Sequence, residues 1–189
     1  PQQPERGPVM GISVEVSGAQ KLQQMRLAIE KLSDSSLQQE LLESIGAIVE
    51  SQTRRRISDE KTSPAGARWQ EWSESYRQTR HGNQSLLQGN GDLLDSIQYI
   101  VERGHVRVGS PLSYSAVHQD GFDGSVSVST HQRLIHQAFG RALKHPVWQT
   151  VGAHTRQMNI PQREYLGLSN ANSEELMHVI GDFWKEVLP

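Results

Sequence analysis

Residues 114–122, YSAVHQDGF, gather hydroxyl, imidazole, amide and carboxylate side chains within nine positions, and such groups are the material of an acid–base active site. Catalysis of that kind needs a nucleophile, a base and an orienting group that meet in space. His118 and Asp120 are two residues apart, a spacing that turns them to different faces of a helix. No G-x-S-x-G turn surrounds Ser113 or Ser115 to present a nucleophile. The stretch therefore does not predict an enzyme.

The same residues fit a structural role on a short helix. The segment LSYSAVHQ is long enough for two turns, Ser110 suits the N-cap position and Pro111 suits the first helical position. Gly121 can end such a helix. One face of this helix then packs on the core, while the other face hydrogen-bonds the backbone of a loop. We expect that loop to lie at the start of the strand near Ile160. The residues expected to make these contacts are Tyr114, His118 and Gln119.

Metal and cofactor chemistry has little support in the sequence. The eight histidines form neither an H-x3-H nor an H-E-x-x-H pattern, and the absence of cysteine excludes thiolate ligands and disulfides. We expect no metal site, no catalytic residue and no cofactor.

Two further clusters have more than one interpretation. Arg54, Arg55 and Arg56 end an amphipathic helix, where cations suit the negative end of the helix dipole. They could contact DNA or a protein partner, or they could form a solvated terminus, and a net charge of −2 gives no general drive toward nucleic acid. Trp69 and Trp72 could stack on a ligand, but anchoring a loop or a partner interface is the favoured use of such aromatics.

Hydrophobic periodicity predicts the elements that must position these residues. Alternation favours a strand at 12–16, and helical spacing favours helices at 22–32 and 37–49. A hairpin is predicted at 97–108 around an ERGH turn, and a C-terminal helix at 176–187. Capping pairs are expected at the helix starts, formed by Ser36 with Gln39 and by Asn172 with Glu175.

The chain is predicted to be one α+β domain, with an antiparallel sheet packed against N-terminal and C-terminal amphipathic helices. Residues 1–11 are expected to form a flexible arm, residues 12–189 the domain, and residues at about 122–160 a polar insertion or loop. Only 35% of the residues are hydrophobic, so we expect part of the chain to be covered only in an assembly. No apolar run approaches the roughly 18 residues that span a bilayer, and no membrane partner is expected.

Four segments, taken in order, resemble one family. They are PAGARWQEWSESY (64–76), LLQGNGDLLDSI (86–97), VRVGSPLSYSAVHQDG (106–121) and IPQREYLGLS (160–169). Together they are similar to the blocks of the phage virion morphogenesis, or tail completion, family of Mu-like contractile-tailed phages and prophages. The sequence departs from the family where Tyr114-Ser115 replaces the usual Tyr-Ala. The structural or interface candidates within or beside these blocks are Trp69, Trp72, Gly91, Gly109, Tyr114, His118, Gln119, Gly121, Pro161, Arg163, Leu166 and Gly167.

The resemblance implies a non-enzymatic protein that acts late in assembly, made in the host cytoplasm and placed in the tail or neck of the virion. It implies a homo-oligomeric ring, with sixfold the expected symmetry, that meets the tail tube or sheath and the head-completion or connector proteins. Genomic DNA would be a passing contact. Two alternatives remain open: a capsid assembly factor that leaves the finished particle, and an enzyme such as a peptidoglycan hydrolase or nuclease carried by it.

On this reading YSAVHQDGF is a structural joint. Changes at Gly121 or Arg163 are then predicted to damage assembly, because both residues would hold the joint in shape. Arg163 follows Pro161, and its guanidinium could fork onto a carboxylate or onto backbone carbonyls.

Overall fold

The computed structural model describes residues 19–80, 84–138 and 141–188. The arm expected at 1–11 and the strand expected at 12–16 lie outside these residues. The elements in chain order are α1 (Ala19–Leu32), α2 (Ser35–Arg55), the π-helical turn η1 (Arg56–Glu60), α3 (Glu74–Arg77), α4 (Asp92–Ser96), β1 (Gln98–Glu102), β2 (His105–Gly109), α5 (Ser115–Asp120), β3 (Phe122–Val128), β4 (His131–Ala138), β5 (Arg141–Val151), β6 (His154–Ile160) and α6 (Asn170–Val187).

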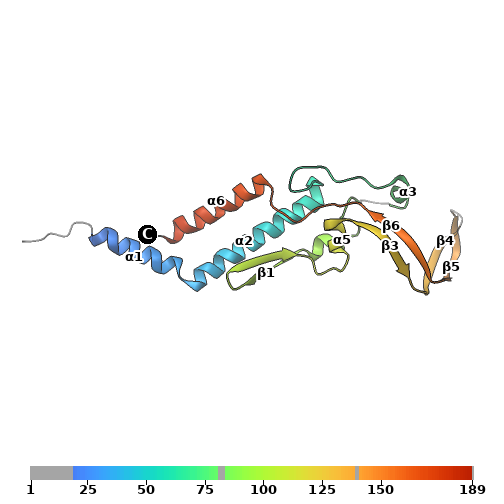
Figure 1. Ribbon diagram of the computed structural model, residues 1–189, viewed down its shortest axis with the longest axis horizontal. Coiled ribbons are helices and arrows are strands. Elements are labelled where there is room, and N and C mark those ends of the chain that lie inside the picture. Colours follow the sequence, from blue (N-terminus) through green and yellow to red (C-terminus); the bar gives the residue numbers. More distant parts are fainter. Residues whose placement is uncertain (1–18, 81–83, 139–140, 189) are drawn as a thin grey trace, which may run out of the picture.

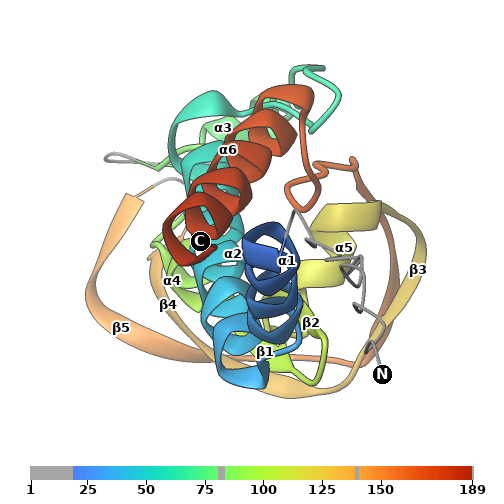
Figure 2. The same ribbon diagram turned by 90° about the vertical axis from the view of Figure 1, so that its left-hand side faces the viewer.

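The molecule is elongated, with α2 running along its helical part (Figure 1). The helix α6 and the β1–β2 hairpin lie on different sides of α2, and α1 continues beyond them at one end (Figures 1 and 2). The strands β3 to β6 extend from the other end. We call the helical part with the β1–β2 hairpin the body and residues 122–160 the β-arm.

The predicted α+β class is confirmed, and every strand pair is antiparallel. Within the described part of the chain the strands form three separate two-stranded ribbons, β1–β2, β3–β6 and β4–β5, in place of one continuous sheet. The β1–β2 hairpin agrees with the prediction and pairs Gln98 with Gly109 and Glu102 with His105. It packs on α2, where Gly46 leaves room for the ring of Tyr99.

The β-arm is the segment in which the sequence showed the weakest pattern. Phe122 pairs with Ile160 and Val128 with His154 in the first ribbon, and His131 pairs with Val151 in the second. A β-bulge interrupts the second ribbon after Ile135. The segment expected as a polar insertion or loop thus consists of two antiparallel ribbons placed end to end, at an angle to each other (Figure 1).

The predicted helices at 22–32, 37–49 and 176–187 are confirmed as α1, α2 and α6, but both capping predictions were wrong. The carboxylate of Asp34 accepts from the amide of Ser36 at 2.8 Å, so Asp34 caps α2. At α6 the cap is Ser169, which exchanges hydrogen bonds with Asn172 in a capping box. In each case a better placed acceptor precedes the expected one by two or three residues, and the backbone amides are satisfied there first.

The helix predicted to begin at Ser110 and Pro111 also begins elsewhere. α5 starts at Ser115, and the Ser110 hydroxyl instead lies 2.7 Å from that of Ser96 and accepts from the amide of Leu112 at 3.2 Å. With its hydroxyl turned to these partners, Ser110 closes a turn and does not cap a helix. Gly121 does end α5, with φ 76°.

The hydrophobic core is small and lies near the C-terminal end of α2. Its buried cluster consists of Ile57, Trp69, Leu86, Leu93, Ile97 and Tyr165. Large apolar side chains at both ends of the molecule stay exposed, among them Met25, Ile29 and Trp148. The fold therefore has a packed middle and two poorly covered ends.

Candidate functional site

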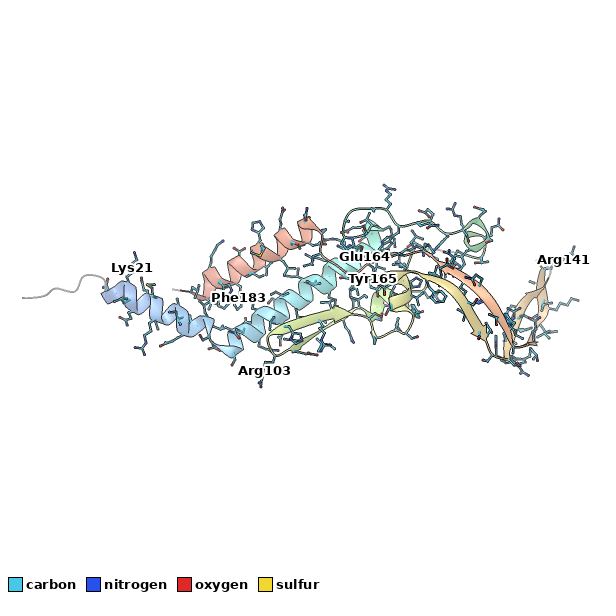
Figure 3. The ribbon with its side chains drawn as sticks, viewed as in Figure 1. Lys21, Arg103, Arg141, Glu164, Tyr165 and Phe183 are labelled. Carbon is cyan, nitrogen blue, oxygen red and sulfur yellow. The ribbon has the colours of Figure 1, made fainter. Side chains whose placement is uncertain are left out.

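The first and last residues of the β-arm meet the body at one place, which we call the junction. It comprises α5, residues 161–169, η1 and the loop segment 68–72. The arm leaves the junction directly after Gly121 and returns to it at Ile160. Figure 3 shows Glu164 and Tyr165 here, between the helices and the arm. Any constraint at the junction therefore fixes the direction in which the arm projects.

Gln119 ties α5 to the returning chain. Its Oε1 accepts from the backbone amides of Tyr165 and Leu166, both at 3.0 Å, and its Nε2 donates to the Leu166 carbonyl at 3.3 Å. The side-chain amide thus pairs with backbone groups as a neighbouring strand would. The sequence predicted that Gln119 bonds the chain near Ile160, and the structure places these bonds five and six residues further along, at Tyr165 and Leu166.

Arg163 joins three segments. Its amide donates to the His118 carbonyl at 2.8 Å, while its Nε and Nη2 both donate to the Gln70 carbonyl at 3.0 and 2.9 Å. The predicted fork is thus made onto one backbone carbonyl and not onto a carboxylate. Burial lowers the pKa of the Arg163 guanidinium from its ordinary value, and Glu71 partly opposes that shift.

His118 lies half-buried against the junction. Its ring makes an edge contact with Tyr114 at 5.9 Å between centroids, and its Nδ1 is buried with no hydrogen-bond partner among the described residues. Burial, and then the nearby Arg163 cation, lower its pKa. Both effects favour the neutral imidazole.

The sequence did not indicate that the side chain of Arg56 is buried and bonded to the chain that leads into α6. Its side chain is only 1% exposed, and it donates to the carbonyls of Tyr165 at 3.0 Å and Gly167 at 2.6 Å and to Asn172 Oδ1 at 2.6 Å. The interpretation of Arg56 as part of a solvated or DNA-contacting terminus is corrected, because a buried guanidinium has no surface to offer a phosphate. Burial lowers its pKa, and Glu60 partly opposes that shift.

The other two arginines of this cluster are partly exposed and paired within the chain. Arg54 donates to the Ile97 carbonyl at 2.8 Å and lies 3.1 Å from Glu50. Arg55 pairs with Glu60 at 3.0 Å. The three consecutive arginines therefore point in different directions: Arg54 to the residue before β1, Arg55 to the end of η1, and Arg56 to the segment that precedes α6.

The two tryptophans lie on the loop over the junction. Trp69 is buried in the core, and its indole nitrogen donates to the Glu164 carbonyl at 3.1 Å. Trp72 is half-buried and contacts the Tyr76 ring edge-on at 5.8 Å. Both side chains thus contribute to packing of the loop.

Two of the candidate glycines lie where a side chain would not fit. Gly121 has φ +76°, and a Cβ there would stand 2.9 Å from the amide nitrogen of Gln162. Gly167 has φ +135°, and its Cβ would stand 2.6 Å from Cγ of Pro64. Gly91 precedes α4 with φ +103°, whereas a Cβ added at Gly109 would meet nothing within 4 Å.

The remaining candidates differ in burial. Leu166 packs on the edge of the core, Pro161 is half-buried, and Tyr114 is largely exposed. Sequence reasoning did not single out Tyr165, and it named Asn172 only as the first member of a different capping pair. Both residues are buried: the Tyr165 amide donates to Gln119, and Arg56 donates to the Tyr165 carbonyl and to Asn172 Oδ1. The Ser-x-x-Asn spacing of the capping box was the one available signal for Asn172.

The junction has the geometry of a structural joint. The Ser115 hydroxyl donates to the Ser110 carbonyl at 3.4 Å and is not paired with His118. Across the described ranges 19–80, 84–138 and 141–188, no group of three potential metal-ligating side chains lies together. In that same part of the chain no helix is long and apolar enough to cross a membrane.

Comparison with known proteins gives two matches. The model of the phage virion morphogenesis family matches residues 20–184. The putative capsid assembly protein G of Escherichia phage Mu is 23% identical over 173 residues, which cover 89% of this chain and 94% of that protein. No solved structure matches the chain.

Proposed function

Since the chain belongs to the phage virion morphogenesis family, we propose that it is a non-enzymatic structural subunit that completes the tail or neck of the virion. Copies of it would form a ring around the tail axis, sixfold in our proposal, and would meet the tail tube or sheath and the connector proteins of the head. Genomic DNA would pass through such a ring.

The observation that carries this proposal is the large uncovered surface of a single chain. It exposes 14637 Å², whereas a compact monomer of this size exposes about 9,000 Å². The difference is larger than the roughly 1,600 Å² that a standard protein–protein interface buries in total. A protein of this shape gains its missing contacts by joining other subunits, which is what a component of a ring does.

The β-arm is the element best suited to reach a neighbouring copy. Leu134, Val147 and Trp148 on it are 41%, 52% and 65% exposed. The outer edges of β4 and β5 pair with no further strand among the described residues. Exposed apolar groups and free strand edges are common means of attaching one subunit to another.

The charge of the arm supports the same partner. Residues 122–160 contain four basic residues and one acidic residue, Asp123, which leaves 15 basic and 20 acidic residues in the remainder of the chain. The arm is thus positive and the rest is negative, so the arm of one copy is electrostatically complementary to the body of the next.

The experiment that tests this function is electron microscopy of a lysate from the phage with this gene disrupted. Filled heads beside unjoined tails are expected, and abnormally long tails would narrow the role to tail termination. Normal, joined particles would contradict the proposal. Complementation with the unaltered gene is the control and should restore joined particles.

A capsid assembly factor is the second candidate, favoured by the name of the phage Mu relative. Such a factor acts on the head and is not retained in the finished particle. Missing or malformed heads in the same lysate, together with absence of the protein from purified virions, would establish this alternative.

A further inference from the structure

The first helix carries an apolar face that no other described residue covers. Leu22, Met25, Ile29 and Leu32 recur at spacings of three and four, and they are 65%, 58%, 62% and 44% exposed. We call them the α1 stripe. Such spacing places the four side chains on one side of the helix, as in the seam of a coiled coil.

The position of α1 keeps this stripe away from the middle of α6 in the same chain. The ammonium of Lys31 donates to the carbonyl of Val187, which is the last residue of α6. From this contact α1 extends away from the body, beyond the end of α6 (Figure 1). Among residues 19–80, 84–138 and 141–188, the α1 stripe therefore has no partner.

The helix α6 has an outward face with an unexplained glycine at its centre. Met177, Gly181 and Trp184 are spaced by four and three residues and share one side of the helix. Met177 is 67% exposed, Gly181 and Trp184 are half-buried, and a Cβ on Gly181 would meet nothing within 4 Å. We call these three residues the α6 face.

The other glycine within a long helix, Gly46, has a clear structural reason to be glycine. A Cβ on Gly46 in α2 would stand 2.4 Å from the Tyr99 ring, so packing within the chain requires that glycine. No such contact accounts for Gly181, although glycine inside a helix is less favourable than alanine. A bare backbone at this point allows another helix to approach closely.

Charge selects which helix fits there. α1 carries Lys21, Arg26 and Lys31 against Glu30, a net charge of +2. The sequence of α6 holds four acidic residues and one lysine, a net charge of −3. Two α1 helices would repel each other, whereas α1 and α6 of different copies attract.

We propose that the α1 stripe of one copy packs across the α6 face of a neighbouring copy. This inference rests on the proposed ring and deepens it, because it names a surface through which successive copies join. The bare backbone at Gly181 lets the two helices come close, while Met177 and Trp184 flank the apolar side chains of α1.

The test is sedimentation velocity of the purified full chain over a range of concentrations. Ile29→Glu places an acid in the α1 stripe, and Gly181→Gln places a side chain where α1 would approach. Each change is expected to weaken self-association at least tenfold. The matched control is Gln23→Glu, which adds the same charge on the opposite side of α1 and should leave association unchanged.

A further variant separates folding from association. Gly181→Ala should raise the thermal midpoint of the chain, because alanine favours the helix, and should at the same time weaken association. Unchanged association in both Ile29→Glu and Gly181→Gln would overturn this proposal. That result would leave the ring standing if the unaltered chain self-associates, whereas an unaltered chain that stays monomeric would contradict the ring itself.

Discussion

At the scale of single residues, the junction is held by side chains that replace missing backbone pairing. Gln119 pairs with two backbone amides, and the guanidiniums of Arg56 and Arg163 donate to backbone carbonyls. Cationic donors make stronger hydrogen bonds than neutral ones, and a planar guanidinium can donate twice to one acceptor. The junction therefore depends on arginine specifically and not on positive charge in general.

Arg163→Lys tests this dependence. Lysine cannot donate from two fixed nitrogens to the Gln70 carbonyl, so we expect a loss of about 1–3 kcal/mol in the free energy of unfolding. Urea denaturation measures it. The control, Arg107→Lys at an exposed position on the hairpin, should change the stability by no more than about 0.5 kcal/mol. Equal effects of the two changes would contradict the role assigned to Arg163.

Gly121→Ala tests the close contact between the residue before the β-arm and the chain that follows it at Gln162. The positive φ and the 2.9 Å approach to Gln162 both oppose a side chain, and we expect a loss of about 1–3 kcal/mol. Gly109→Ala has open space around it and serves as the control. Phage carrying Gly121→Ala should produce fewer joined particles, and full infectivity would show that the junction is not needed for assembly.

The neutral state of His118 predicts a dependence of stability on pH. Its pKa lies below the ordinary 6.5 in the folded chain, so on acidification the unfolded chain takes up this proton first. The contribution of His118 is therefore full above pH 6.5 and is lost as the pH falls toward the lowered pKa. On acidification from about pH 7.5 to about pH 5, the thermal midpoint should fall more steeply for the unaltered chain than for His118→Gln. Identical slopes would refute the prediction.

The sequence indicated the role of some of these residues and not that of others. Gln119 stood out because a short polar helix before a glycine has few uses other than bonding a loop. Arg56 did not, because its neighbours Arg54 and Arg55 have the same chemistry and only the path of the chain decides which one turns inward. The wrong caps have a similar cause, since Asp34 and Ser169 are as suitable as the residues that were expected.

At the scale of elements, the segments with a periodic apolar pattern were the ones that could be predicted. The helices α2 and α6 bury one face each, so their apolar residues recur at helical spacing and were recognised. The second ribbon of the β-arm buries neither face, and most of β5 is exposed. A ribbon that is exposed on both sides has no alternating pattern to detect, and its pairing is set by the chain reversal alone.

The arm itself provides the prediction at this scale. Replacing Leu134 and Trp148, which pair across β4 and β5, with serine removes exposed apolar area without touching the core. The far-ultraviolet circular dichroism spectrum should stay unchanged, while the yield of joined particles should fall at least tenfold. The matched control is Gln132→Ser with Thr150→Ser, the neighbouring pair on the same face. Normal yields with the apolar pair replaced would exclude the arm as an assembly surface.

At the scale of the whole molecule, the body and the arm have different roles. The body holds a small core around Ile57 and Tyr165, and the junction attaches the arm to it in a fixed direction. The two ends expose apolar side chains that a solitary chain would not need. Low hydrophobic content already indicated a chain completed by assembly, but the shape that makes this concrete came only from the structure.

Immunogold electron microscopy of purified virions, with antibody raised against this chain, tests most directly whether the protein is part of the tail or neck. If the chain is a structural subunit of the tail or neck, gold should lie where the head meets the tail, and particles from phage with the gene disrupted should carry no label. Absence of the protein from finished virions, or label confined to heads, would contradict a structural role in the tail or neck.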